Sequence, residues 1–157
     1  MNVSERRAEA VARQMEKTGI DEALIERLVR TFYARIRVHP VLGPIFNERI
    51  EDWELHMSRL RAFWSSVALG TGAYAGSPMQ KHVPLPVDGR HFDMWLQLFC
   101  DTVHELCPPV AAEHFIERAK RIAESLELAI AAENKVMLFK GERLRRADKD
   151  VFLPAAG

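Results

Sequence analysis

Cysteine is scarce in this chain of 157 residues, which contains only Cys100 and Cys107. The two lie in one helical pattern seven residues apart, about 10 Å along the helix axis, which exceeds the reach of a disulfide bond. We therefore expect two thiols in a reducing compartment. The chain lacks the cysteine framework of a small disulfide-stabilised secreted domain.

The chain also lacks a net charge, because 22 basic residues balance 22 acidic ones. No overall electrostatic attraction therefore draws it to nucleic acid or to an anionic membrane. The N-terminus lacks the apolar core of a signal peptide, and no uninterrupted apolar run approaches the length of a membrane span. These absences predict a cytoplasmic protein that does not bind nucleic acid and does not insert into membranes.

Strand-like alternation, internal repeats and low-complexity tracts are missing too, so the sequence predicts an all-α protein. Apolar residues recur at three- and four-residue steps in four stretches, which predict helices over 21–38, 52–69, 90–107 and 110–130. Large side chains on all four patterns require a common interior. We expect the first two helices to cross the last two and to leave a slot that a flat apolar cofactor would fill.

The connections contain proline and glycine. Residues 39–46 hold two prolines and a glycine, which predicts a turning connector with Phe46 as an aromatic plug at a helix corner. Glycines after residue 69 end the second long helix, and Pro78 can start only a short helical piece before Pro84 and Pro86 end it. The mixed-charge residues 142–150 are expected to be solvated and frayed.

Two histidines are candidates for a metal–cofactor site. His82 belongs to the short proline-bounded piece, and a lone imidazole facing Phe, Trp and Tyr side chains suits one axial bond to a haem iron, because aromatic side chains can cover the porphyrin. The alternative is a surface histidine in a loop. His56 shares a helix face with large apolar groups. Four roles are open to it: a ligand gate, a hydrogen-bond donor, a second axial ligand in the ferric state, or an outward-pointing side chain. Its place one turn from Trp53 and Leu60 favours an inward or rim position.

Other metal chemistry is disfavoured. Cys100, His104 and Cys107 follow one helix edge at a spacing that raises the question of zinc, but no fourth ligand stands out and semi-buried thiols are the simpler interpretation. No Cys-x-x-Cys-His sequence is present, which excludes a covalent c-type haem. Asp101 and His104 form a single acidic-x-x-His pair, not the repeated pair of a di-iron bundle.

Several co-linear segments resemble those of group III truncated haemoglobins, over roughly residues 24–130. They are Phe32-Tyr33, Leu42-Gly43-Pro44-Ile45-Phe46, Trp53-x-x-His56, Phe63-Trp64-Ser65-Ser66, Tyr74-x-Gly76-x-Pro78, His82, His91-Phe92-x-x-Trp95-Leu96-x-Leu98-Phe99 and Arg118-Ala119-x-Arg121-Ile122-Ala123-x-Ser125.

The resemblance implies a truncated globin domain over 21–130, a two-over-two helical sandwich around haem b, between a helical extension (1–20) and a charged C-terminal extension (131–157). It implies that His82 is the proximal iron ligand. It places Tyr33, His56 and Trp95 on the distal side, where phenol and indole can donate hydrogen bonds to a bound diatomic ligand. The resemblance also implies that Phe46 and Leu60 contact the porphyrin. Lys81 is a candidate partner for a haem propionate because it lies beside His82, and Tyr74 is another such candidate.

The first functional hypothesis is a haem protein that binds O2, NO, CO or a related ligand and turns it over, for example by oxidising NO. Turnover would need an external reductase, because the chain has no Gly-x-Gly-x-x-Gly nucleotide fingerprint. The alternative is a non-catalytic binder for oxygen storage, transport or sensing. A peroxidase-like role is weaker, since the distal motifs show no arginine, and a haem-free helical interaction module is the fallback.

Overall fold

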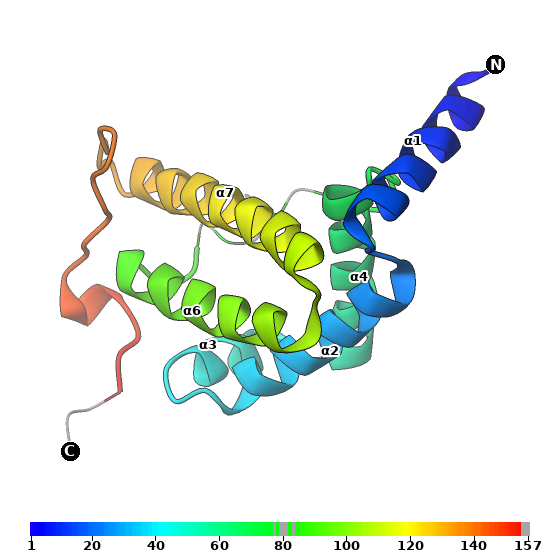
Figure 1. The fold of residues 1–157 in the computed structure, drawn as a ribbon. Coiled ribbons are helices and arrows are strands. Elements are labelled where there is room, and N and C mark those ends of the chain that lie inside the picture. The colour runs from blue at the N-terminus through cyan, green and yellow to red at the C-terminus, as the bar shows by residue number, and fades with distance from the viewer. Residues whose placement is uncertain (77, 79–81, 83, 155–157) are drawn as a thin grey trace.

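A computed structural model describes residues 1–76, 78, 82 and 84–154, and these fold entirely into helices and connections, without a strand (Figure 1). This confirms the all-α prediction. The helices are α1 (Val3–Thr18), α2 (Glu22–Val38), α3 (Leu42–Arg49), α4 (Trp53–Leu69), α6 (Gly89–Leu106), α7 (Pro109–Glu133) and the short 3-10 helix η1 (Asp148–Asp150).

The ends of the long helices follow from their capping residues. The side chains of Asp21, Asp52 and Asp88 accept hydrogen bonds from backbone N–H groups in the first turns of α2, α4 and α6. These bonds satisfy donors that have no partner within the helix. Gly70 ends α4 in the left-handed conformation, with φ of 77°, which glycine adopts without a steric penalty. The helices predicted over 21–38, 52–69 and 90–107 correspond to α2, α4 and α6, and each predicted boundary is right to within one residue.

The long helices form the two crossed pairs that the sequence predicts. α2 packs against α4, α6 packs against α7, and α2 also packs against α6 and joins the pairs (Figure 1). Aromatic rings from all four long helices pack together inside this sandwich. The rings of Trp64 and Phe99 stack at 5.1 Å between centroids, and Phe32 and Phe115 pack edge-on against them. Such pairs contribute about 1 kcal/mol each beyond the burial of apolar area.

The predicted connector over residues 39–46 is wrong, because most of it belongs to helix α3. Two features that the sequence interpretation missed make this helix possible. Nδ1 of His39 accepts hydrogen bonds from the N–H groups of Val41 and Leu42 at 3.1 Å each, so it caps the helix start. Pro44 lies in the first turn, where a backbone N–H is not needed. Gly43 lets α3 approach α2, because a Cβ there would lie 2.7 Å from the Arg37 carbonyl oxygen.

The C-terminal segment is solvated, as its charges predict, but it is not frayed: of residues 142–150 all but Leu144 and Arg146 are exposed, yet the segment folds onto the domain. After α7 it turns back and runs past the N-terminal end of α6 (Figure 1). Leu144 and Val151 are 2% and 8% exposed, and Leu144 packs into an apolar cluster with Val87 and Ile130. Buried apolar side chains within a charged sequence explain why the segment folds onto the domain.

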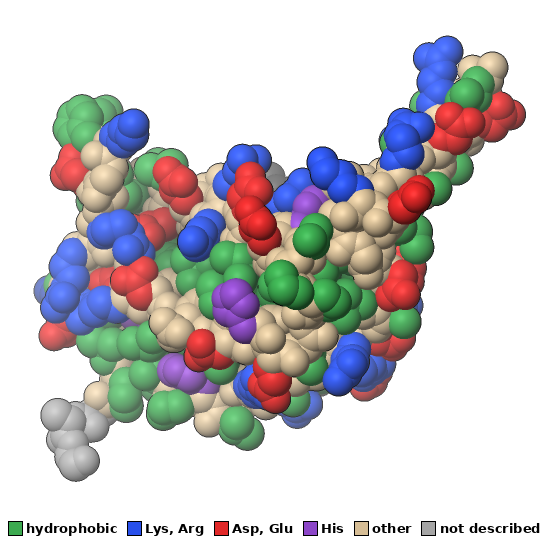
Figure 2. All heavy atoms as spheres, in the orientation of Figure 1, with side chains coloured by type: hydrophobic (Ala, Val, Ile, Leu, Met, Phe, Trp, Pro, Cys, Tyr) green, Lys and Arg blue, Asp and Glu red, His purple; other side chains and the backbone are tan. Residues whose placement is uncertain are grey.

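Helix α1 contacts α4 and α7 through its C-terminal half. The amide nitrogen of Gln14 lies 3.3 Å from Nε2 of His114, and this Nε2 lies 2.8 Å from the Ala68 carbonyl oxygen. The N-terminal half projects from the body, and the face in Figure 2 mixes acidic with basic side chains. Of the residues that the structure describes, none belong to a helix that has both the length and the apolar character of a membrane span.

Candidate functional site

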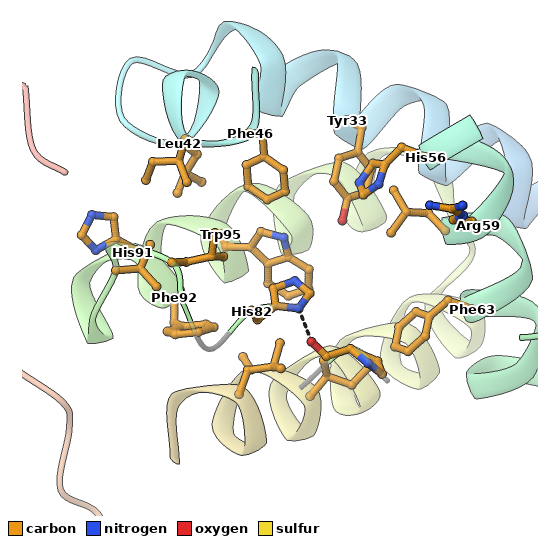
Figure 3. A pocket seen from close by; sticks show the side chains of 18 of the residues that line it. Tyr33, Leu42, Phe46, His56, Arg59, Phe63, His82, His91, Phe92 and Trp95 are labelled. Atoms are coloured by element: carbon orange, nitrogen blue, oxygen red, sulfur yellow. Dashed lines mark hydrogen bonds between the residues drawn. The ribbon is translucent and has the colours of Figure 1, made fainter. Parts of the chain in front are cut away.

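A cavity of about 260 Å³ lies at the centre of the sandwich, where α2, α3, α4, α6 and α7 meet (Figure 3). Its lining is mainly aromatic and aliphatic, which suits a flat apolar ligand. The structure brings six of the seven predicted cofactor and ligand residues to this one cavity: Tyr33, Phe46, His56, Leu60, His82 and Trp95. The seventh, Lys81, lies outside the described residues.

His82 lies on the cavity wall, four residues after Pro78. Both residues are helical, in agreement with the short helical piece predicted here, and the intervening residues are not described. Nδ1 of His82 lies 2.6 Å from the Pro78 carbonyl oxygen (Figure 3). A carbonyl can only accept, so Nδ1 carries the proton and donates it. The other ring nitrogen, Nε2, is then the one with a lone pair to offer a metal.

Tyr33 projects into the cavity from α2 and is 5% exposed. Its ring packs edge-on against His56 at 5.8 Å and against Phe46 at 6.0 Å. Burial raises the pKa of the Tyr33 phenol well above its ordinary value, and a hydrogen bond with the Trp95 side chain opposes that shift only in part. The phenol is therefore neutral at any physiological pH, which keeps its O–H available as a donor.

His56 lies beside Tyr33 on the first turns of α4 (Figure 3). Its ring meets Trp53 edge-on at 5.6 Å, and the side chain is half-buried. The Asp52 cap fixes where α4 begins and so brings this turn over the cavity. Of the orientations that the sequence leaves open for His56, the structure adopts the inward one, on the cavity lining.

Two polar residues of the cavity lining received no site role from the sequence. Arg59 is exposed and lies three residues after His56, on the same helix face, so helical spacing was the available signal. His91 is 2% exposed, accepts from the Asp88 N–H at 3.1 Å and lies 2.7 Å from the Phe152 carbonyl oxygen. That second bond involves a residue 61 positions away, and no local pattern predicts it.

The candidate zinc ligands do not form a metal centre. Within residues 1–76, 78, 82 and 84–154, no three side chains of His, Cys, Asp or Glu converge on one point. Cys100 and Cys107 are free thiols, and burial raises the pKa of Cys107 to about 11. This agrees with the simpler interpretation as semi-buried thiols.

The cavity fits a haem group on the chemistry of its own side chains. One wall offers an imidazole whose Nδ1–H donates to a carbonyl, as metal-bound histidines usually do. The lining also offers a neutral phenol and an indole as donors, and the rest of it consists mainly of rings and aliphatic groups. Arg59 at the surface adds a cation that suits a carboxylate.

Comparison with known proteins agrees with this geometry. The sequence model of the bacterial-like globin family matches residues 14–130. The chain is 33% identical to the group 3 truncated hemoglobin ctb of Campylobacter jejuni over 118 residues, which cover 72% of this chain and 93% of the relative. It is also 33% identical to the group 2 truncated hemoglobin YjbI of Bacillus subtilis over 88 residues, 54% of this chain and 66% of that protein.

A solved structure extends the similarity to three dimensions. The crystal structure of group III truncated hemoglobin from Campylobacter jejuni superposes with a TM-score of 0.66 at 30% identity. The superposition covers 78% of this chain and 96% of that one. The chain therefore belongs to the bacterial-like globin family, and within it to the group III truncated haemoglobins.

Proposed function

We propose that this protein binds haem b through His82 and uses the cofactor to bind O2, NO, CO or a related small ligand. The observation that carries the proposal is the 2.6 Å contact between Nδ1 of His82 and the Pro78 carbonyl oxygen. This bond orients the imidazole and increases its basicity at Nε2, the nitrogen that would hold iron. When bound, haem supplies the iron that coordinates the diatomic ligand and exchanges electrons with it.

Tyr33 and Trp95 would stabilise the ligand. Tyr33 would donate from a phenol that burial keeps neutral, and the Trp95 indole N–H, which shares a hydrogen bond with Tyr33, would be a second donor. Hydrogen bonds of this kind are stronger in a dry pocket than in water. Phe46 and Leu60 would contact the porphyrin faces. Lys81 and Arg59 would pair with the propionates.

His56 would act as a gate beside the ligand or as a second axial ligand in the ferric state. Its place next to Tyr33 on the cavity lining supports either role. The ferric absorption spectra of the wild type and of His56→Ala separate them. A low-spin wild-type spectrum that becomes high-spin in the variant supports coordination, and a low-spin spectrum that the substitution leaves unchanged excludes it.

Among the possible activities, we favour redox chemistry on the ligand, such as oxidation of NO, with electrons from a separate reductase. Two donors in a buried pocket would slow the release of O2, and slow release would favour chemistry over transport. The alternative is a non-catalytic binder for storage, transport or sensing. We also propose a cytoplasmic location, which the two free thiols support.

Titration of the purified protein with hemin tests the cofactor. We expect one equivalent of haem to produce a sharp Soret band, followed by the bands of the CO complex after reduction. A protein that gains no Soret band under these conditions would be the haem-free helical module instead.

Rapid mixing of the oxygenated protein with NO tests the activity. Fast formation of nitrate that continues over many turnovers with a reductase supports catalysis. Slow or single-turnover nitrate formation with every reductant supplied would support the non-catalytic binder.

A further inference from the structure

The residues that follow His82 are held by the distant C-terminal segment. We name residues 143–152 the C-terminal clamp. Nη1 of Arg146 donates to the carbonyl oxygens of Leu85 and Val87, at 3.1 Å each. Between these two contacts, the Phe152 N–H donates to the Pro86 carbonyl oxygen at 2.9 Å. Three successive carbonyl groups are therefore bound by the clamp.

The next two residues also bond to the clamp. The carboxylate of Asp88 is fully buried, and its Oδ2 accepts from the Arg146 N–H at 3.0 Å. The Gly89 N–H donates to the Leu144 carbonyl oxygen at 2.9 Å. Residues 85–89 thus form an unbroken series of contacts with the clamp. Breaking such contacts is costly, because they are largely buried and include charged partners.

The C-terminal clamp also bonds to helix α7 of the sandwich. The Glu127 carboxylate on α7 is 5% exposed, accepts from Arg143 Nε at 2.9 Å and accepts from the Leu144 N–H at 2.8 Å. The buried side chain of Leu144 packs into the apolar cluster that also holds Val87. The clamp therefore connects α7 to the segment after His82.

His82 itself is coupled to this segment over a short distance. Its carbonyl oxygen accepts from the Leu85 N–H at 3.0 Å, and both Leu85 and Val87 line the same cavity as the imidazole. The family match ends at residue 130, so the whole clamp lies beyond the part of the chain that the family model covers.

We propose that the C-terminal clamp is a positioning element for His82, with Arg146 as its main contact. By fixing residues 85–89 it would hold the imidazole in place to bind iron, although none of residues 143–152 lines the cavity. This inference rests on the proposed function, because it assigns the clamp a role at the haem that His82 would bind.

The test compares Arg146→Ala with a matched control in the full chain loaded with haem. Arg145→Ala is the control, because the neighbouring arginine is 67% exposed and pairs with the surface residue Asp148 at 3.5 Å. Arg146→Lys keeps the charge but loses the planar guanidinium. The measurements are the rate of haem transfer to an excess of an apoglobin acceptor and the iron–histidine stretching frequency in the resonance Raman spectrum of the ferrous protein.

We expect Arg146→Ala to lose haem about tenfold faster than the wild type, as is typical when the support of a metal-bound histidine is removed. The iron–histidine band should shift and broaden. Arg146→Lys should lose haem at an intermediate rate, and the haem-loss rate of Arg145→Ala should stay within about twofold of the wild-type rate. An Arg146→Ala protein that matches Arg145→Ala in either measurement overturns the proposal.

Hydrogen exchange of the haem-free chain separates this inference from the proposed function. The amides of Leu85 and Val87 should exchange faster in Arg146→Ala than in Arg145→Ala, and equal exchange would overturn the clamp whether or not haem binds. A wild-type chain that takes up no haem would instead refute the proposed function, and with it the role of the clamp at the cofactor.

Discussion

Single residues decide how long a ligand would stay in the cavity. The Tyr33 phenol is buried and neutral, and it interacts with the Trp95 indole, so the two donors form one small network. Donors in such a network are coupled, and removing one changes what the other contributes. The sequence alone identifies both residues, because the globin resemblance includes them, but the coupling becomes visible only in three dimensions.

Replacement of these donors is predicted to speed O2 release. Tyr33→Phe and Trp95→Phe should each raise the dissociation rate about fivefold to tenfold, which corresponds to the loss of roughly one hydrogen bond. The double variant should deviate from the product of the two effects because the donors interact. Laser photolysis or stopped-flow mixing gives these rates. Tyr74→Phe removes the chain's other phenol, which also lines the cavity, and shows whether the loss of any phenol there has the same effect. Unchanged rates in all three distal variants would contradict the assignment.

The cysteines should be slow to react in the folded protein. Burial raises the pKa of Cys107 to about 11 and also raises that of Cys100, so thiolate is scarce at pH 8. In a Cys100→Ala background, we expect Cys107 to react with a disulfide reagent at least about tenfold more slowly in native than in denatured protein. Equal rates in the two states would show that the thiol is not shielded.

Among the secondary-structure elements, α3 is the helix that the sequence pattern did not predict. Pro40, Gly43 and Pro44 are typical of a connector, and the periodicity of such a short segment is weak. The helix forms because the His39 ring supplies a cap and because Gly43 permits close contact with the end of α2. Both reasons depend on tertiary placement. The long helices, in contrast, follow from apolar spacing that is readable in the sequence, and Asp side chains cap α2, α4 and α6.

The cap of α3 makes this element sensitive to acid. Nδ1 of His39 accepts hydrogen bonds only when the ring is neutral, and burial lowers the pKa of His39. Its contribution to stability is therefore present above the ordinary histidine pKa of about 6.5. It is lost as the pH falls through the lower pKa of the folded protein.

The experiment compares the wild type with His39→Asn, whose side chain can cap without titrating. Between pH 7.5 and pH 5, the free energy of unfolding of the wild type should fall by about 1 kcal/mol more than that of the variant, the usual value of a cap. Denaturant titrations at the two pH values provide the comparison. Parallel losses in both proteins would mean that His39 does not control the helix.

For the whole molecule, the sequence predicts the sandwich of crossed helix pairs and most of its cavity, because the large apolar side chains of four helices require a shared interior. It does not predict the C-terminal segment. Residues 142–150 are mostly exposed, as their charges predict, but their attachment to the domain is not predicted: Leu144 is buried and Arg146 reaches carbonyl groups about 60 positions away. Contacts between segments so distant in sequence leave no local pattern.

The extensions differ in how they join the domain. We propose a globin domain over 21–130 with a helical extension before it and a charged extension after it. The first extension meets the sandwich near Gln14 and His114, whereas the second bonds to the segment that follows His82.

Haem uptake by His82→Gly, followed by absorption spectroscopy with and without added imidazole, tests most directly whether His82 holds the iron. We predict that the variant loses the five-coordinate histidine spectrum of the ferrous protein and binds haem more weakly, and that imidazole restores the spectrum by filling the space of the side chain. A His82→Gly protein with the wild-type affinity and spectrum in the absence of imidazole would contradict the claim that His82 holds the iron.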